Sequence, residues 1–254
     1  MYEDKRPLMW LSQDCWQCLK IIQDMGYANN FVFLLSKYMK QVQEAVRNRL
    51  PDIQGDWLRM HYEGKTLTFS LSDEAILHYK PRIQEFSCFG SAVKILGAYE
   101  NYLKGIVEVS DQDIPQDMNR FKSDHKKSIR KAKDFWGDKL GRGIDFLHEV
   151  FGWNPHPSYR PALRFMFELR NVAVHNAAIA SQRLCSLANA QHIHVTGTLK
   201  VGDSVPWNLS MVLQLEHLII SVVSEADRYI TPKIRLPIIE QHAFWYEDNE
   251  NNGK

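Results

Sequence analysis

The chain has 254 residues, of which 44% are hydrophobic and 24% are charged, a composition that excludes an intrinsically disordered protein and allows one or two domains with a sizeable core. Its formal charge of +1 excludes attraction to nucleic acid by the molecule as a whole, so such attraction must come from local clusters of basic residues. No apolar run approaches a membrane span and Met1–Arg6 leads into no signal-like segment, which predicts a soluble, cytoplasmic protein with no membrane partner.

The first fifty residues carry two helical patterns. Apolar residues recur at helical spacing over 8–24 and again over 30–50. Cys15 and Cys18 form a single C-x-x-C without the second pair that a structural zinc site needs. We therefore expect these two and the other two cysteines to be packed thiols.

The pattern changes after residue 56. Residues 57–62 and 65–71 alternate in polarity around a Glu-Gly pair, which predicts a β-hairpin. Asp73 is expected to cap a short helix that Pro81 ends. Residues 1–82 are thus predicted to form an N-terminal helical region with a small β-hairpin, and they show no catalytic constellation.

The next predicted helix spans residues 84–109 and contains one charged residue in its apolar stripe. Glu100 occupies a position where the stripe calls for an apolar side chain. Since an unpaired buried charge is costly, Glu100 either reaches solvent at the edge of the stripe or pairs with a cation such as Arg170. In the second case Glu100 would hold the guanidinium group in place.

The most basic stretch of the chain runs from residue 120 to 142. It has nine lysines and arginines against three aspartates, with three aromatic residues interleaved. This pattern suits contacts with phosphates and bases, and it also suits a solvated helix face. If the chain binds RNA, we expect the contacts to come from Lys126, Lys127, Arg130, Lys131 and Lys133. A short helix over residues 144–151 should follow.

A helix predicted from about Arg160 to Ala180 contains the motif E-L-R-N-V-A-V-H-N, from Glu168 to Asn176. Its core face is predicted at residues 165, 169, 172 and 173. Phe167 and Val174 lie about 180° away with Asn171, a second partly apolar face that the same core is not expected to bury.

Arg170 and His175 flank this second face, about 140° apart around the axis and about 7.5 Å apart along it. Within one helix they do not converge. A two-fold copy packed on this face, with Phe167 and Val174 at the interface, would bring both pairs around one cleft. Asn171 is four residues before His175 and is placed to fix the orientation of its ring.

An arginine followed by a polar residue, three apolar residues and a histidine resembles the motif of the HEPN superfamily. Glu168 before Arg170, and Asn176 after His175, are most similar to the RiboL-PSP and related prokaryotic defence branches. The resemblance implies a mainly α fold, with an HEPN-like bundle of four to five helices over residues 83–232 and the N-terminal helical region as an extension. Residues 233–254 are expected to be a C-terminal tail.

The resemblance also implies a metal-independent endoribonuclease that acts as a homodimer and needs no cofactor. Arg170 and His175 would be catalytic, with support from Glu168, Asn171, Asn176 and Glu100. Histidine supplies a base or an acid and arginine a forked donor for phosphate oxygens, so cleavage of an RNA such as tRNA or mRNA would leave 2′,3′-cyclic phosphate and 5′-hydroxyl ends. Members of these branches act as toxins or antiviral defence effectors, held in check by an antitoxin protein.

Two other functions remain open from the sequence. A non-catalytic HEPN module would use the same face to dimerise or to bind a partner or a nucleotide. A transfer enzyme is disfavoured because the thirteen glycines form no phosphate-binding loop.

The end of the chain adds two elements and no site. Residues 191–205 contain β-prone runs with His192 and His194, a pair that lacks the further ligands of a metal site. An amphipathic helix over 212–229 should pack against the core face of the motif helix.

Overall fold

The structure is a computed structural model that describes residues 8–49, 53–54, 57–62, 64–70, 72–125, 142–176, 178–191, 199–205 and 207–242. This part of the chain is mainly helical, as predicted. Four helices build its bundle, namely α1 (Gln13–Lys37), α3 (Asp73–Asp113), α6 (Tyr159–His175) and α8 (Leu209–Ile230).

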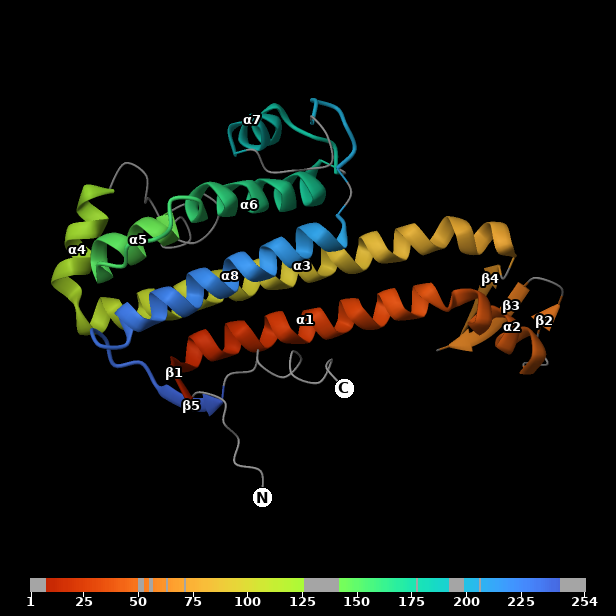
Figure 1. Ribbon diagram of the computed structural model, residues 1–254, viewed down its shortest axis with the longest axis horizontal. Coiled ribbons are helices and arrows are strands. Elements are labelled where there is room, and N and C mark those ends of the chain that lie inside the picture. The colour runs from red at the N-terminus through yellow and green to blue at the C-terminus, as the bar shows by residue number, and fades with distance from the viewer. Residues whose placement is uncertain are drawn as a thin grey trace, which may run out of the picture.

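The four helices share one hydrophobic core. In Figure 1, α3 and α8 lie between α6 on one side and α1 on the other. The predicted core face of the motif helix is confirmed, since Phe165, Leu169 and Val172 are buried in this cluster and Ala173 packs against it. The predicted last helix is confirmed as α8, which buries its apolar stripe in the same cluster.

Helix α3 is one element where the sequence predicted two. The hydroxyl of Ser72 accepts a hydrogen bond from the backbone N–H of Ala75 at 3.1 Å, so Ser72, and not Asp73, is the N-cap. Pro81 lies inside the helix and does not end it. Its side chain is exposed, and Leu77, whose carbonyl loses a helical donor to the proline ring, is 73% exposed. Water can therefore replace the missing donor.

The N-terminal helices also differ from prediction. Residues 8–12 form strand β1 (Leu8–Ser12), α1 continues through the predicted gap after residue 24, and Tyr38 separates it from α2 (Met39–Arg49). Strand β1 pairs antiparallel with β5 (Ile238–His242). Helical spacing alone does not show that residues 8–12 are held in this pair by a segment more than two hundred residues away.

Ser12 connects this small sheet to the bundle. Its hydroxyl caps α1 by accepting from the N–H of Cys15 at 3.1 Å, and its own N–H donates to the carboxylate of Asp227 on α8 at 2.7 Å. Asp227 is 1% exposed and also accepts from the Ser12 hydroxyl. The start of α1 is thereby fixed to the end of α8.

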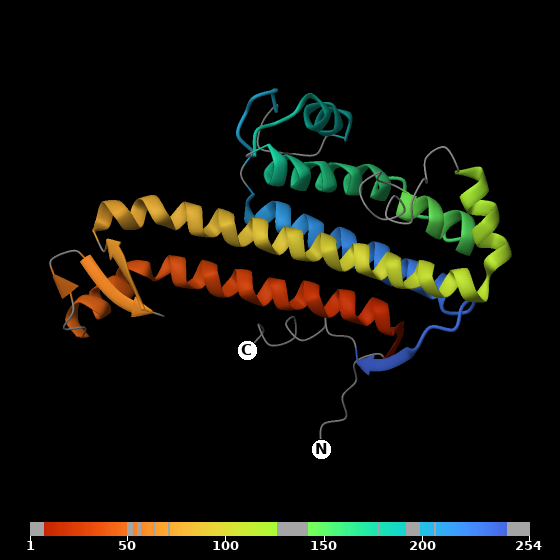
Figure 2. The same ribbon diagram turned by 180° about the vertical axis from the view of Figure 1, so that it is seen from behind.

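The predicted hairpin is confirmed as β3 (Trp57–Tyr62) and β4 (Lys65–Ser70), with β2 (Ile53–Gln54) as a third strand. Gly64 in the turn has φ 74°, a conformation that glycine adopts without strain. Figure 2 shows this sheet and α2 at the far end of the α1–α3 pair, away from α6 and α8.

The domain boundary predicted between residues 82 and 83 falls inside one helix. Both residues belong to α3, and α1 shares the core of the main bundle. The predicted tail begins with buried Ile234 and Leu236 and with β5. Residues 243–254 lie outside the described residues.

Three shorter helices complete the described fold, namely α4 (Pro115–Asp124), α5 (Arg142–Phe151) and α7 (Gln182–Gln191). Helix α5 was predicted, and it ends at Gly152, which has φ 73°. Helices α4 and α7 were not predicted. The residues of α4 lie between two stronger helical patterns, and the motif helix was expected to continue to Ala180, just before α7 begins.

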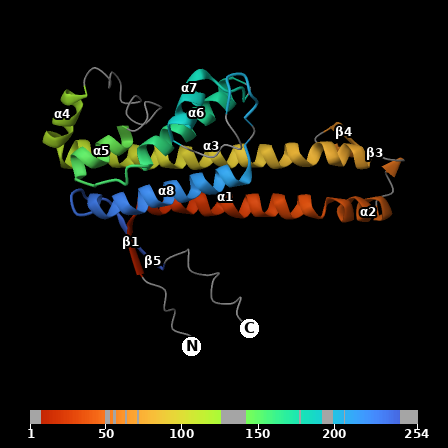
Figure 3. The same ribbon diagram turned by 45° about the horizontal axis from the view of Figure 1, so that its top comes forward.

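Among the described helices, α8 alone has the length and apolar composition of a membrane span, and 39% of its most apolar window is buried. It packs against α3 and α1, and its apolar stripe lies in the core. Figure 3 shows α8 lying alongside α1 on the side of α3 away from α6.

Candidate functional site

The motif lies on the second half of α6, which ends at His175 and not at Ala180. Asn176 is the C-cap, and its side-chain amide donates to the carbonyl of Ile179 at 2.7 Å. Ala178 has φ 60°, so the chain reverses just after the motif. Asn176 thus shapes the turn that leaves His175 at the exposed end of the helix.

Arg170 is held by α3. Its guanidinium lies 3.5 Å from the carboxylate of Glu100 and 5.9 Å above the ring of Phe167. The side chains of Arg170 and Glu100 are 25% and 21% exposed, so the pair is partly shielded from water. Of the two alternatives for Glu100, the structure therefore shows the pairing with Arg170.

Asn171 contacts Arg170 and not His175. Its side-chain oxygen accepts a hydrogen bond from the Arg170 guanidinium at 3.3 Å. His175 is exposed, and its side chain has no hydrogen-bond partner within the described residues. The prediction that Asn171 orients the His175 ring is therefore wrong for the isolated chain.

Glu168 faces a different neighbour. Its carboxylate lies 3.2 Å from Arg183 and accepts from the Ser181 hydroxyl at 3.3 Å, and both partners belong to the segment of α7. Glu168 is 8% exposed. It fastens α7 to α6 and does not support Arg170 directly.

The second apolar face of α6 is smaller than predicted. Phe167 is 3% exposed, and its ring lies 6.4 Å from that of Tyr99 on α3. Tyr99 and Arg170 cover it, so Phe167 needs no second subunit and the prediction that it lies at a dimer interface is wrong. Val174 remains 50% exposed.

The open face of α6 also carries Arg164, which the sequence reasoning missed. Arg164, Asn171 and His175 are seven and four residues apart, so they follow one line along the helix. Arg164 is exposed, and no carboxylate pairs with it in the described part of the chain. Helical spacing counted backward from His175 would have identified it.

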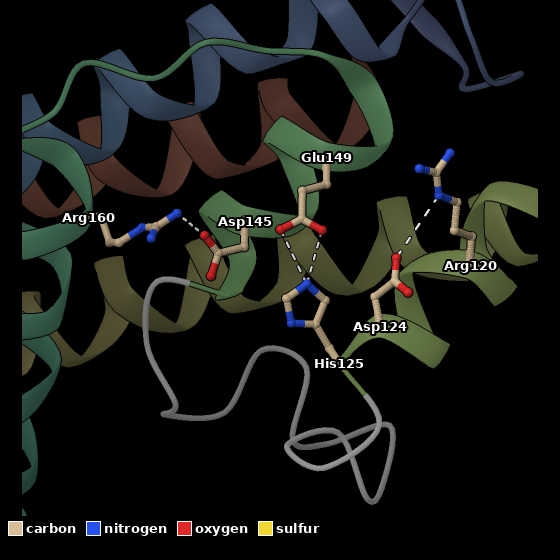
Figure 4. A network of polar contacts seen from close by, with 6 residues as sticks. All are labelled: Arg120, Asp124, His125, Asp145, Glu149 and Arg160. Atoms are coloured by element: carbon tan, nitrogen blue, oxygen red, sulfur yellow. Dashed lines mark hydrogen bonds and ion pairs between the residues drawn. The ribbon is translucent and has the colours of Figure 1, made fainter.

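A polar network lies at the other end of α6 (Figure 4). The ring of His125, at the end of α4, lies 3.0 Å from the carboxylate of Glu149 on α5. Asp145 on the same helix pairs with Arg160 at the start of α6. These contacts fasten α4, α5 and α6 together.

The predicted RNA contacts fall outside the described residues, namely Lys126, Lys127, Arg130, Lys131 and Lys133. His192 and His194 do so as well.

The prediction of packed thiols is confirmed. Cys15, Cys18, Cys88 and Cys185 are all buried and free. Burial raises the pKa of the Cys18 thiol to about 12 and that of Cys88 to about 11, so both are neutral at ordinary pH. Within the described residues, no three histidine, cysteine or acidic side chains gather as metal ligands.

No protein-family model, curated protein or solved structure matches this chain.

Proposed function

We propose that the chain is a cytoplasmic, metal-independent endoribonuclease of the HEPN type, in which Arg170 and His175 are catalytic. The observation that carries this proposal is the state of the two motif residues. Arg170 is oriented by Glu100, Asn171 and Phe167, whereas His175 is exposed at the end of the same helix. A fixed cation and a free histidine are the two kinds of group that cleavage of a phosphodiester needs, although they do not meet within one chain.

The residues have distinct roles in this proposal. His175 takes the proton of a 2′-hydroxyl or gives one to the leaving 5′-oxygen, and Arg170 donates to the phosphate oxygens as charge builds on them. Glu100 and Asn171 position the guanidinium. Arg164, on the same open face, is placed to contact a neighbouring phosphate of the RNA.

Each chain supplies one motif histidine, while cleavage uses both a base and an acid. We therefore propose that a second copy contributes the other histidine, through a contact across the open face of α6 at Asn171, Val174 and His175. With Phe167 buried, this contact offers one large exposed apolar side chain, so it is expected to be weak without RNA. A toxin or antiviral role, and control by an antitoxin protein, are part of the same proposal.

The test is an RNase assay on total RNA and on tRNA. Arg170→Ala and His175→Ala are each expected to lower the cleavage rate by roughly a hundredfold or more, because each removes a group that acts in the transition state. EDTA should have no effect, and the products should carry 2′,3′-cyclic phosphates. Arg228→Ala and His217→Ala, at exposed positions on α8, are the matched controls.

Intact RNA after incubation with the wild-type protein would overturn the proposal. A mixture of the wild-type and His175→Ala proteins tests the second copy. If one cleft needs both histidines, mixed pairs are inactive and the activity falls more steeply than the wild-type fraction, whereas a single-chain site loses activity in proportion to that fraction.

One observation favours a different function. Arg170 is already engaged by Glu100, and Arg170 and His175 do not meet in one chain. A non-catalytic HEPN module that binds a nucleotide or a protein on the open face of α6 would have this arrangement. It predicts RNA or nucleotide binding that His175→Ala weakens, with no cleavage by the wild-type protein.

A further inference from the structure

Helix α1 exposes an apolar stripe along its second half, on the part of the molecule that α8 and α6 do not reach (Figure 1). Five large apolar side chains form this α1 stripe, and they are 61%, 61%, 53%, 44% and 44% exposed in the order Tyr27, Phe31, Leu34, Leu35 and Tyr38. Tyr27, Phe31, Leu34 and Tyr38 are spaced by four, three and four residues. This spacing keeps them on one side of a helix and is that of a helix–helix seam.

The opposite side of α1 faces α3. Asn29 and Ser36 are 1% and 2% exposed, and both lie about 160° or more around the helix from the middle of the α1 stripe. The side-chain oxygen of Asn29 accepts from the Ser87 hydroxyl of α3 at 2.8 Å. The small polar residues thus line the contact within the chain. The large apolar residues lie on the other side of α1, with Leu34 also bordering Lys80 and Gln84 of α3.

The α1 stripe is large for a surface that stays in water. At roughly 150–250 Å² for a large side chain, these five expose on the order of 500 Å². A patch of this size on a monomer is commonly an interaction site. Buried against an equal area, it gives about 1,000 Å² in total, the least that a specific protein interface needs.

We propose that a second copy of this chain covers the α1 stripe, with the two α1 helices antiparallel. The four-three-four spacing reads the same in both directions, so a two-fold axis between residues 31 and 34 matches the stripe with itself. In this register Tyr27 lies opposite Tyr38 of the copy, and Phe31 lies opposite Leu34. Between Tyr27 and Tyr38 the sequence has one charged residue, Lys37, whose ammonium group lies 5.5 Å from the ring of Tyr38 at the end of the stripe.

This contact is separate from the proposed ribonuclease site. Helices α1 and α6 lie on opposite sides of α3 in both Figure 1 and Figure 3, so a pair formed through α1 leaves the open face of α6 accessible to RNA. One chain can make both contacts at once, and the α1 contact does not depend on whether the chain cleaves RNA.

Sedimentation equilibrium on the full chain tests the proposal. Leu34→Glu is expected to halve the mass of the assembly, because it places a charge at the centre of the seam. Leu213→Glu is the matched control, since Leu213 is 44% exposed on α8, and this variant should keep the wild-type mass. Circular dichroism checks the fold of both variants, and RNA cleavage should not change in either. A monomeric wild type, or an unchanged mass for Leu34→Glu, would overturn the proposal.

Cysteine cross-linking tests the register. The four native cysteines are buried, so a mild oxidant should act on introduced thiols first. The double variant Tyr27→Cys with Tyr38→Cys is expected to form covalent dimers, and Tyr27→Cys alone is not. Covalent dimers of the single variant would show parallel helices and overturn the antiparallel arrangement.

Discussion

Gly105 on α3 lies against the carboxyl group of Asp14 on α1. A Cβ atom at residue 105 would be 2.5 Å from Oδ2 and 2.8 Å from Cγ of Asp14, closer than non-bonded atoms pack. Asp14 is half-buried, and burial followed by repulsion from Glu108 raises its pKa. Glycine disfavours helix, so its presence here reflects the close approach of α1 and not the needs of α3.

Gly105→Ala is therefore expected to lower the free energy of unfolding by about 1–3 kcal/mol, the usual cost of overpacking. Gly90→Ala, in the same helix but with no atom within 4 Å of the added Cβ, should raise it by about 0.5–1 kcal/mol through helix propensity. Urea unfolding of both variants measures the difference. Equal stabilisation by both would show that the Asp14 side chain moves aside without cost.

At the site, the sequence identified Glu100 as an anomaly in an apolar stripe and left two outcomes open, exposure to solvent or pairing with a cation such as Arg170. The structure shows the pairing with Arg170, which depends on how α6 lies on α3. The burial of Phe167 was not predictable, because it depends on where Tyr99 of α3 lies. The prediction for Asn171 was wrong because its side chain can reach either Arg170, one residue before it, or His175, four residues after it. Only the position of the Arg170 guanidinium decides which of the two it contacts.

Among the elements, α3 continues through a proline that the sequence predicted would end it. A proline inside a helix removes one hydrogen bond and clashes with the preceding turn, at a cost of about 3 kcal/mol. Pro81 nevertheless lies inside α3, where its exposed position lets water serve the freed carbonyl. Contacts hold the helix on both sides of the proline: before it, Asp73 accepts from the Gln43 amide of α2 at 3.1 Å, and after it, the Ser87 hydroxyl donates to Asn29 of α1.

Pro81→Ala should raise the free energy of unfolding by about 1–2 kcal/mol, since it restores the helical hydrogen bond but frees the unfolded chain. Arg82→Ala, at the next exposed position, is expected to change it by less than about 0.5 kcal/mol. Chemical denaturation of the two variants is the measurement. A destabilised Pro81→Ala would mean that the proline fixes a bend that the packing of α3 needs.

At the scale of the whole molecule, three helices meet at Glu216 of α8, which lies near both α1 and α3. Its Oε1 atom is buried and has no hydrogen-bond partner among the described residues, and it lies near Gly26 of α1. The same carboxylate contributes, after burial, to the raised pKa of Cys88 on α3. Burial raises the pKa of Glu216 from an ordinary value of 4.5 to about 6.

A carboxyl group whose pKa is higher in the folded than in the unfolded state favours folding when neutral. Its contribution is fully present below pH 4.5, is lost as the pH rises to about 6, and stays lost above that. Glu216→Gln should therefore exceed the wild type in stability by about 1 kcal/mol near pH 8, after allowance for solvent screening, and should match it near pH 4. Urea midpoints across this range measure it, with exposed Glu44→Gln as control. A difference that does not change with pH would contradict the assignment.

The sequence by itself determined the mainly α class, the β3–β4 hairpin and the core faces of α6 and α8, because periodicity is a local signal. For Glu100 it left two alternatives, and the structure decided for the pairing with Arg170. Only the tertiary structure decided which partner covers a second apolar face and which such face stays open. It covered Phe167, joined β1 to β5, carried α3 through Pro81, and left the α1 stripe in solvent. Periodicity reports that a helix has an apolar side, but whether that side faces the core depends on contacts between residues far apart in the chain.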